Sequence, residues 1–190
     1  MDPVAVGFET VTALIGAISL FLSRLDSSRQ HSEKSPDWRP SLMQLSKALR
    51  TWKQHAEGTN HTVREWAAGE IDVDVAQFSM RHSLSLQTGG IDEVRYRLFG
   101  ERGPHYPEWE SLHNLLSIYG TELLEVLRTA FEGRRDLVDE LTAELPRLRE
   151  VEGESLQKTL GTLDLTYQQL DRATTKLDDY IRRNFPLGVR

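Results

Sequence analysis

Glu110 and His113 come closest, by residue type and spacing, to a known catalytic arrangement. They stand three positions apart, a spacing that places both side chains on one face of a helix. Carboxylate-bridged di-iron bundles use this Glu-x-x-His spacing, but they need a second copy of it and further glutamates. The chain has no second Glu-x-x-His. We therefore expect this pair to be surface residues and predict no metal site.

Other catalytic motifs are also missing from the sequence. The 190 residues include no cysteine, which excludes a cysteine nucleophile, a thiolate zinc site and an iron–sulfur cluster. Phosphate-binding and dinucleotide-binding glycine loops, the nucleophile elbow and the H-E-x-x-H zinc motif do not occur. We predict that the protein is not an enzyme and has no catalytic residue and no cofactor.

Glu9 is the second residue whose side chain could have a chemical role, because it is the only charged residue between Val4 and Leu22. A carboxylate inside a membrane usually marks function, and several copies would form an acidic ring around a pore. Alternatively, Glu9 is a partly exposed residue near a helix start, where the helix dipole favours a negative charge. The sequence leaves both interpretations open.

The segment around Glu9 predicts a hydrophobic N-terminal helix over residues 1–24. Asp2 and Glu9 replace the basic residues that a secretory signal would carry. A bilayer-spanning helix takes about 20 apolar residues, and a carboxylate at mid-membrane costs about 2.5–3.5 kcal/mol. We expect a helix that is buried in a bundle or, once released, lies in a membrane. Its membrane-active residues would be Val4, Val6, Phe8, Glu9, Val11, Leu14, Ile15, Ile18 and Leu22.

Basic residues follow this helix directly. Between residues 24 and 53, the acidic residues are Asp26, Glu33 and Asp37. Basic side chains beside an apolar helix attract anionic lipid, at about 1 kcal/mol each, although a solvated surface is the simpler interpretation of the charge alone. The lipid-attracting candidates are Arg24, Arg29, Lys34, Arg39, Lys47, Arg50 and Lys53.

The rest of the chain has helical periodicity and predicts an all-α fold, a single helical bundle over residues 1–190. We expect a Ser- and Pro-rich loop over 26–40 and the remaining bundle over 41–190, beginning with a helix from Ser41 to Gly58. Residues 62–100 include short helices and one segment, 75–80, compatible with helix or strand. Residues 109–131 predict one helix, Gly133 a kink or boundary, and 137–148 and 156–181 two further amphipathic helices. The long C-terminal helices would pack around the N-terminal helix.

The overall charge limits the partners. With 23 Lys and Arg against 29 Asp and Glu, the net charge is −6. Non-specific nucleic-acid binding depends on clustered basic residues, so we expect no nucleic-acid partner.

The N-terminal region resembles the start of fungal HeLo cell-death domains and their bacterial counterparts, the Bell domains. The resemblance rests on a Met-Asp-Pro opening into an apolar helix with Gly and Ala, a polar loop, and then Leu42, Leu45, Leu49 and Trp52. Those families are helical bundles related in architecture to the executioner domain of necroptosis pseudokinases and to the coiled-coil domains of plant immune receptors. The resemblance implies programmed cell death in innate immunity or antiphage defence. The first helix would leave the bundle on oligomerisation and permeabilise a membrane.

In those families the trigger is often an amyloid-forming motif after the bundle, templated by a nucleotide-binding receptor. Residues 184–190 do not resemble such a motif; we expect either that the bundle is part of a longer protein or that its trigger differs.

Two functions remain open. The first is a latent effector, cytoplasmic at rest and at the inner face of the cell membrane on activation. Its partners would be anionic lipids, other copies of itself and an upstream sensor. The second is a soluble helical adaptor in which the N-terminal helix is ordinary core.

Overall fold

A computed structural model describes residues 3–31, 37–82, 84, 90–100, 107–150 and 154–185. These residues form eight α-helices and no strand, which confirms the all-α bundle. The helices are α1 (Pro3–Gln30), α2 (Arg39–Ala68), α3 (Val73–His82), α4 (Ile91–Phe99), α5 (Pro107–Tyr119), α6 (Thr121–Glu132), α7 (Arg134–Glu150) and α8 (Glu154–Asn184).

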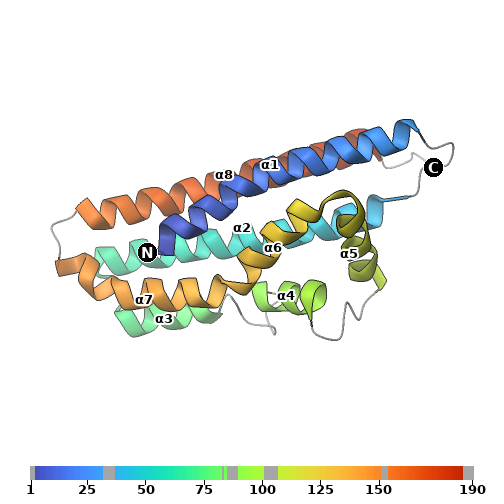
Figure 1. Cartoon of the computed structure of the whole chain (residues 1–190). Coiled ribbons are helices and arrows are strands. Elements are labelled where there is room, and N and C mark those ends of the chain that lie inside the picture. The colour runs from blue at the N-terminus through green and yellow to red at the C-terminus, as the bar shows by residue number, and fades with distance from the viewer. Residues whose placement is uncertain are drawn as a thin grey trace.

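The helices form an elongated bundle in which α1 and α8 lie side by side along one long edge (Figure 1). Helix α2 runs beside α8 through the middle of the bundle, and α6 packs against α1. Helices α3 and α7 pair on the opposite edge. Helix α8 therefore contacts both of the other long helices.

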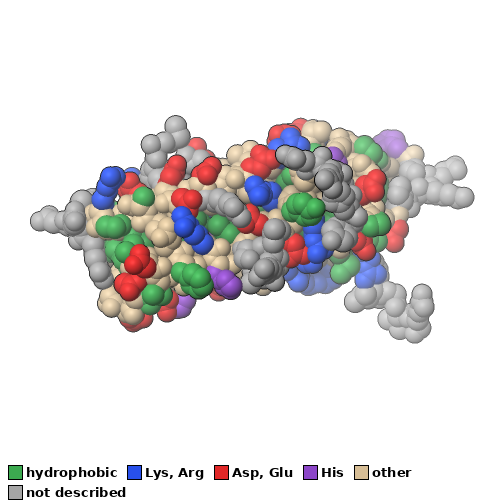
Figure 2. All heavy atoms as spheres, turned by 90° about the horizontal axis from the view of Figure 1, so that it is seen from below, with side chains coloured by type: hydrophobic (Ala, Val, Ile, Leu, Met, Phe, Trp, Pro, Cys, Tyr) green, Lys and Arg blue, Asp and Glu red, His purple; other side chains and the backbone are tan. Residues whose placement is uncertain are grey.

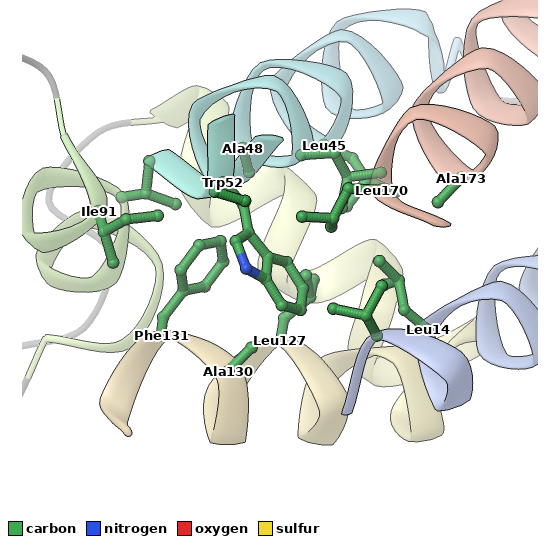
Figure 3. Close-up of a cluster of buried hydrophobic side chains, with 14 of the residues drawn as sticks. Leu14, Leu45, Ala48, Trp52, Ile91, Leu127, Ala130, Phe131, Leu170 and Ala173 are labelled. Carbon is green, nitrogen blue, oxygen red and sulfur yellow. The ribbon is translucent and has the colours of Figure 1, made fainter. Parts of the chain in front are cut away.

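The core is centred on Trp52 of α2, whose ring centroid lies 5.7 Å from that of Phe131. Figure 3 shows these rings between side chains from several helices, including Leu14 of α1 and Leu170 of α8. Each of these four residues is at most 1% exposed. The core thus joins segments that are far apart in the sequence.

Helix α1 lies at the surface of the bundle, with α8 and α6 along one side of it. The C-terminal helices α5, α6, α7 and α8 contact α1 as predicted, but they cover only one of its faces, because its residues alternate between a buried and an exposed face. The helix also continues to Gln30, so residues 26–30 are helix rather than the start of the loop. Asp26 and Ser28 contact neighbouring helices there, and these contacts extend the helix beyond its apolar part.

Helix α2 passes straight through Gly58, where the sequence predicts its end. An added Cβ at Gly58 would meet nothing within 4 Å, and Thr59, Thr62 and Val63 continue the buried face. The helix ends at Gly69, whose φ of 78° is left-handed and whose N–H bonds to the Trp66 carbonyl. Glycine tolerates that conformation best.

Residues 109–131 form two helices rather than one, because the chain turns at Gly120 between α5 and α6. A Cβ at Gly120 would stand 2.7 Å from the ring of Phe21 on α1. The glycine therefore allows α1 to approach the α5–α6 turn closely. Apolar residues keep their helical spacing across the turn, so the sequence pattern does not show it.

The remaining helices follow the predictions more closely. Residues 75–80 lie in helix α3, which settles the choice between helix and strand. Gly133 separates α6 from α7, and α8 ends at Asn184. All four tryptophans are buried; Trp38 is 7% exposed, and its ring centroid lies 5.5 Å from that of Tyr119.

Candidate membrane-active helix and basic groove

Helix α1 has the length and composition of a bilayer-spanning helix over Glu9–Gln30. A core helix of a soluble protein passes the same test, but here only 33% of the most apolar 18 residues are buried. The exposed face carries Glu9, Ala13, Gly16 and Leu20, the last 41% exposed. The apolar helix is therefore attached to the bundle along one face and presents small and apolar residues to solvent on the other.

Most of the predicted membrane-active residues form the attached face. Val11, Leu14 and Ile18 are fully buried and Leu22 is 6% exposed. Ile15 is half-buried against the core, and Glu9 is exposed. The side chains of Val4, Val6 and Phe8 lie outside the part of the chain that the structure describes. The side chains best suited to a lipid environment thus become available only when α1 leaves α6 and α8.

Polar contacts attach the C-terminal half of α1 to its neighbours. Arg24 forms a bidentate ion pair with Glu122 of α6, at 2.6 and 2.8 Å. From α8, Lys176 donates to the Ser19 hydroxyl at 2.6 Å, and the Tyr180 hydroxyl donates to the Asp26 carboxylate at 2.8 Å. These three contacts fix the position of α1 along the bundle.

Three of these groups have shifted pKa values, and the hydrogen bond with Glu122 raises the pKa of Arg24. The hydrogen bond from Arg24 lowers the pKa of Glu122 from 4.5 to about 2. Burial, together with the hydrogen bond to Asp26, raises the pKa of Tyr180 from 10.0 to about 12. Over the neutral range Glu122 is therefore charged and Tyr180 is a donor, as both contacts require.

Three of the seven predicted lipid-attracting residues instead form ion pairs between helices. Arg24 pairs with Glu122, Arg50 with Asp178 at 2.6 Å, and Lys53 with Asp171 at 2.5 Å. The sequence pattern misses these contacts because the carboxylates lie about 100 residues or more further along the chain. Their charge is partly neutralised by the bundle itself.

The other predicted basic residues are arranged differently. Arg29 lies 4.8 Å from the ring centroid of Phe185 and donates to the Asn184 carbonyl at 3.4 Å. Arg39 and Lys47 line a groove, and their side chains form no ion pair with any residue that the structure describes. Lys34 lies outside the described residues.

This groove runs between the start of α2 and the end of α8, with a volume of about 760 Å³. Its cations are Arg39, Lys47, Arg50 and Arg182, and its acidic side chain is Asp178. Apolar side chains line it as well, namely Met43, Ile181 and Phe185, with Met43 55% exposed. We call it the basic groove. Positive charge beside apolar surface suits an anionic group with a hydrocarbon part.

The sequence pattern missed Arg182 of the basic groove, although it stands on the predicted last turn of α8. Arg182 is far in sequence from the basic residues between 24 and 53, so the pattern of charges did not connect it with them. Phe185 also lines the groove and contacts Arg29 at the end of α1. The groove and the end of α1 therefore share a side chain.

Glu110 and His113 do not lie in any cluster of metal ligands. Glu110 is exposed and His113 is half-buried on α5. Among the described residues, no group of three or more His, Cys, Asp or Glu side chains lies close enough to hold a metal ion.

No family model, no characterised protein and no solved structure matches the chain.

Proposed function

We propose that the protein is a latent membrane effector, related in its mode of action to the HeLo and Bell cell-death domains, whose α1 leaves the bundle on oligomerisation and permeabilises a membrane. The observation that carries the proposal is the position of α1. It is the one described helix long and apolar enough to enter a bilayer, and it lies at the edge of the bundle.

Release of α1 requires a compensating interaction. Leu14, Ile18 and Phe21 are fully buried, and each such side chain contributes about 1.5–3 kcal/mol relative to exposure. A bilayer offers the same side chains an apolar environment. Clustering of several copies at a membrane would then favour the released state, because the helices also shield one another.

The basic groove supplies the contact with the membrane in this proposal. Arg39 and Lys47 would meet phosphate groups, while Met43 would reach the apolar layer beneath them. Lys53 would stay in its ion pair with Asp171 of α8, whereas the release of α1 would break the ion pair between Arg24 and Glu122 of α6. The protein would be cytoplasmic at rest and would act at the inner face of the cell membrane, with an upstream sensor causing clustering.

Dye release from liposomes tests the proposal. The purified protein is compared with Glu9→Lys, both alone and fused to a forced oligomerisation tag, on anionic and neutral vesicles. We expect leakage from anionic vesicles when the protein is clustered, and a loss of leakage in Glu9→Lys at an unchanged melting temperature. No leakage from a folded, clustered protein would contradict it.

Two double variants with the same change in net charge distinguish binding through the basic groove from binding through net charge alone. Arg39→Gln with Lys47→Gln removes two groove cations, whereas Arg147→Gln with Arg172→Gln removes two exposed cations from α7 and α8 outside the groove. We expect the first pair to reduce binding to anionic vesicles at least tenfold and the second to change it little. Equal losses would mean that net charge alone determines binding.

The adaptor function remains the second candidate, and α3 favours it. Phe78 is 70% exposed and Val75 45% exposed on that helix, which suits a protein partner. On the face seen in Figure 2, however, hydrophobic side chains lie in small separate groups among charged ones. A protein that binds a partner through Phe78 and never permeabilises vesicles would establish the adaptor.

A further inference from the structure

Arg134 is a buried arginine that the proposed function does not use. It is the first residue of α7, directly after Gly133, and is 4% exposed. Its surroundings include Thr59 of α2, Val138 of α7, and Leu163 and Thr166 of α8. The side chain therefore lies where three helices meet.

The guanidinium of Arg134 has no counter-charge among the residues that the structure describes. It forms no ion pair there, and its Nε is buried without a hydrogen-bond acceptor. Burial lowers the pKa of Arg134 only to about 10, so the group stays positive at neutral pH. A buried charge without a partner destabilises a protein by several kcal/mol.

The described groups around Arg134 add no negative charge. Thr59 donates its hydroxyl hydrogen to the His55 carbonyl at 2.9 Å, and Thr166 donates to the Thr162 carbonyl at 2.8 Å. His55 is 2% exposed, and its pKa is lowered by burial and by the charge of Arg134. A neutral imidazole therefore stands near the guanidinium, and the positive charge is left uncompensated.

A small void has Arg134 in its lining. It has a volume of about 10 Å³ and is lined by Arg134, Thr59, Thr166 and aliphatic side chains. A space of this size holds about one particle the size of a water molecule. It is too small for phosphate, sulfate or a carboxylate group. Water would satisfy the Nε but would leave the charge without compensation.

We propose that this void binds a single-atom anion against Arg134, chloride being the abundant one in a cell. The ion supplies the acceptor that the Nε lacks and compensates the charge between α2, α7 and α8. Its binding stabilises the junction of α6 and α7 against the rest of the bundle. This inference does not depend on the proposed membrane function.

Thermal unfolding in different salts tests the site. The unfolding midpoint is measured in bromide, chloride and gluconate at one ionic strength and at pH 8, for the wild type, Arg134→Met and Arg147→Met. Arg147 is on the same helix, and its side chain is 77% exposed, so the control removes the same charge without touching the void.

We expect bromide and chloride to raise the midpoint of the wild type and of Arg147→Met by about 2–4 °C over gluconate, since that is roughly the shift for 1 kcal/mol in a domain of this size. The increase should saturate with halide concentration and vanish in Arg134→Met. Equal midpoints in all salts, or the same halide effect in all three proteins, would overturn the proposal.

Anomalous scattering from crystals grown in bromide gives a test that does not need a variant to fold. A bromide peak within hydrogen-bond distance of the Arg134 guanidinium supports the site. A water molecule in the void under the same conditions would overturn it.

Discussion

Helices α1 and α2 both pack along α8, but they are attached to it by different means. Asp164, Asp171 and Asp178 stand seven residues apart on α8, and all three contact α2. Asp178 accepts from Ser46 and Arg50, Asp171 from Lys53, and Asp164 from Asn60 and Arg64. No described contact joins α1 to one of these aspartates.

The described polar contacts of α1 with α8 are fewer than those of α2, and none of them is an ion pair with these aspartates. Lys176 reaches Ser19, Tyr180 reaches Asp26, and Arg29 reaches the Asn184 carbonyl at 3.4 Å. Most of the attachment of α1 comes from one buried apolar face, which a bilayer can replace, whereas nothing apolar replaces the carboxylates that α2 needs. The comparison supports the proposal that α1 leaves the bundle while α2 and α8 stay together.

Removal of the central side chain of α2 should have the largest effect. Trp52 is 1% exposed and packs on Phe131, so Trp52→Ala should lower the free energy of unfolding by about 3–5 kcal/mol. Chemical denaturation measures it. Leu20→Ala on the exposed face of α1 is the control, and we expect it to change stability by less than about 0.5 kcal/mol. A similar loss of unfolding free energy in both variants would contradict the difference between the central helix α2 and the exposed face of α1.

Gly120→Ala should detach α1 selectively. The new Cβ would stand 2.7 Å from the buried Phe21 ring, and an overpacked core typically loses about 1–3 kcal/mol. Hydrogen exchange should show faster exchange in α1 with little change in α2. Gly58→Ala, where nothing lies within 4 Å, serves as the control. Uniformly faster exchange across the bundle would show that α1 does not separate from it.

Acid should destabilise the bundle through α2. Burial and the charge of Arg134 hold the pKa of His55 well below 6.5. The unfolded chain therefore binds more protons, and the stability is complete above pH 6.5 and declines as pH falls below it. Urea midpoints between pH 5 and 8 should show this decline, and His55→Gln should weaken it. A decline of the same size in His55→Gln would assign the pH dependence to other groups.

The smallest effect is expected at Gly16 on the exposed face of α1. An added Cβ there meets nothing within 4 Å, so Gly16→Ala should stabilise the helix by up to about 1 kcal/mol through propensity alone. Leakage should persist, because the attached and the released states are both helical. Circular dichroism and thermal melts measure the gain. A lower melting temperature for Gly16→Ala would mean that the added methyl group meets another part of the protein, which would contradict the exposed position of this face.

The sequence predicted what depends on local pattern. The periodicity of α8 and the boundary at Gly133 follow from spacing within one segment, and so does the apolar character of α1. It failed where the contact is with a distant part of the chain: Phe21 of α1 packs closely against the α5–α6 turn at Gly120. Lys53 belongs to an ion pair because Asp171 lies opposite. Of the cations in the basic groove, Arg39, Lys47 and Arg50 are near one another in the sequence and were singled out there, whereas Arg182 lies far along the chain and was not.

The most direct test of α1 release tethers the helix, using the absence of native cysteines. Ser19→Cys with Lys176→Cys, joined by a reducible bis-maleimide, fixes α1 to α8. Asn60→Cys with Asp164→Cys, joined in the same way, fixes α2 to α8 outside the basic groove as the control. Each pair replaces side chains in direct contact. On clustered protein and anionic vesicles, we predict that the α1 tether abolishes dye release until a reductant cleaves it, while the α2 tether leaves release intact. Full leakage with α1 still tethered would contradict the account.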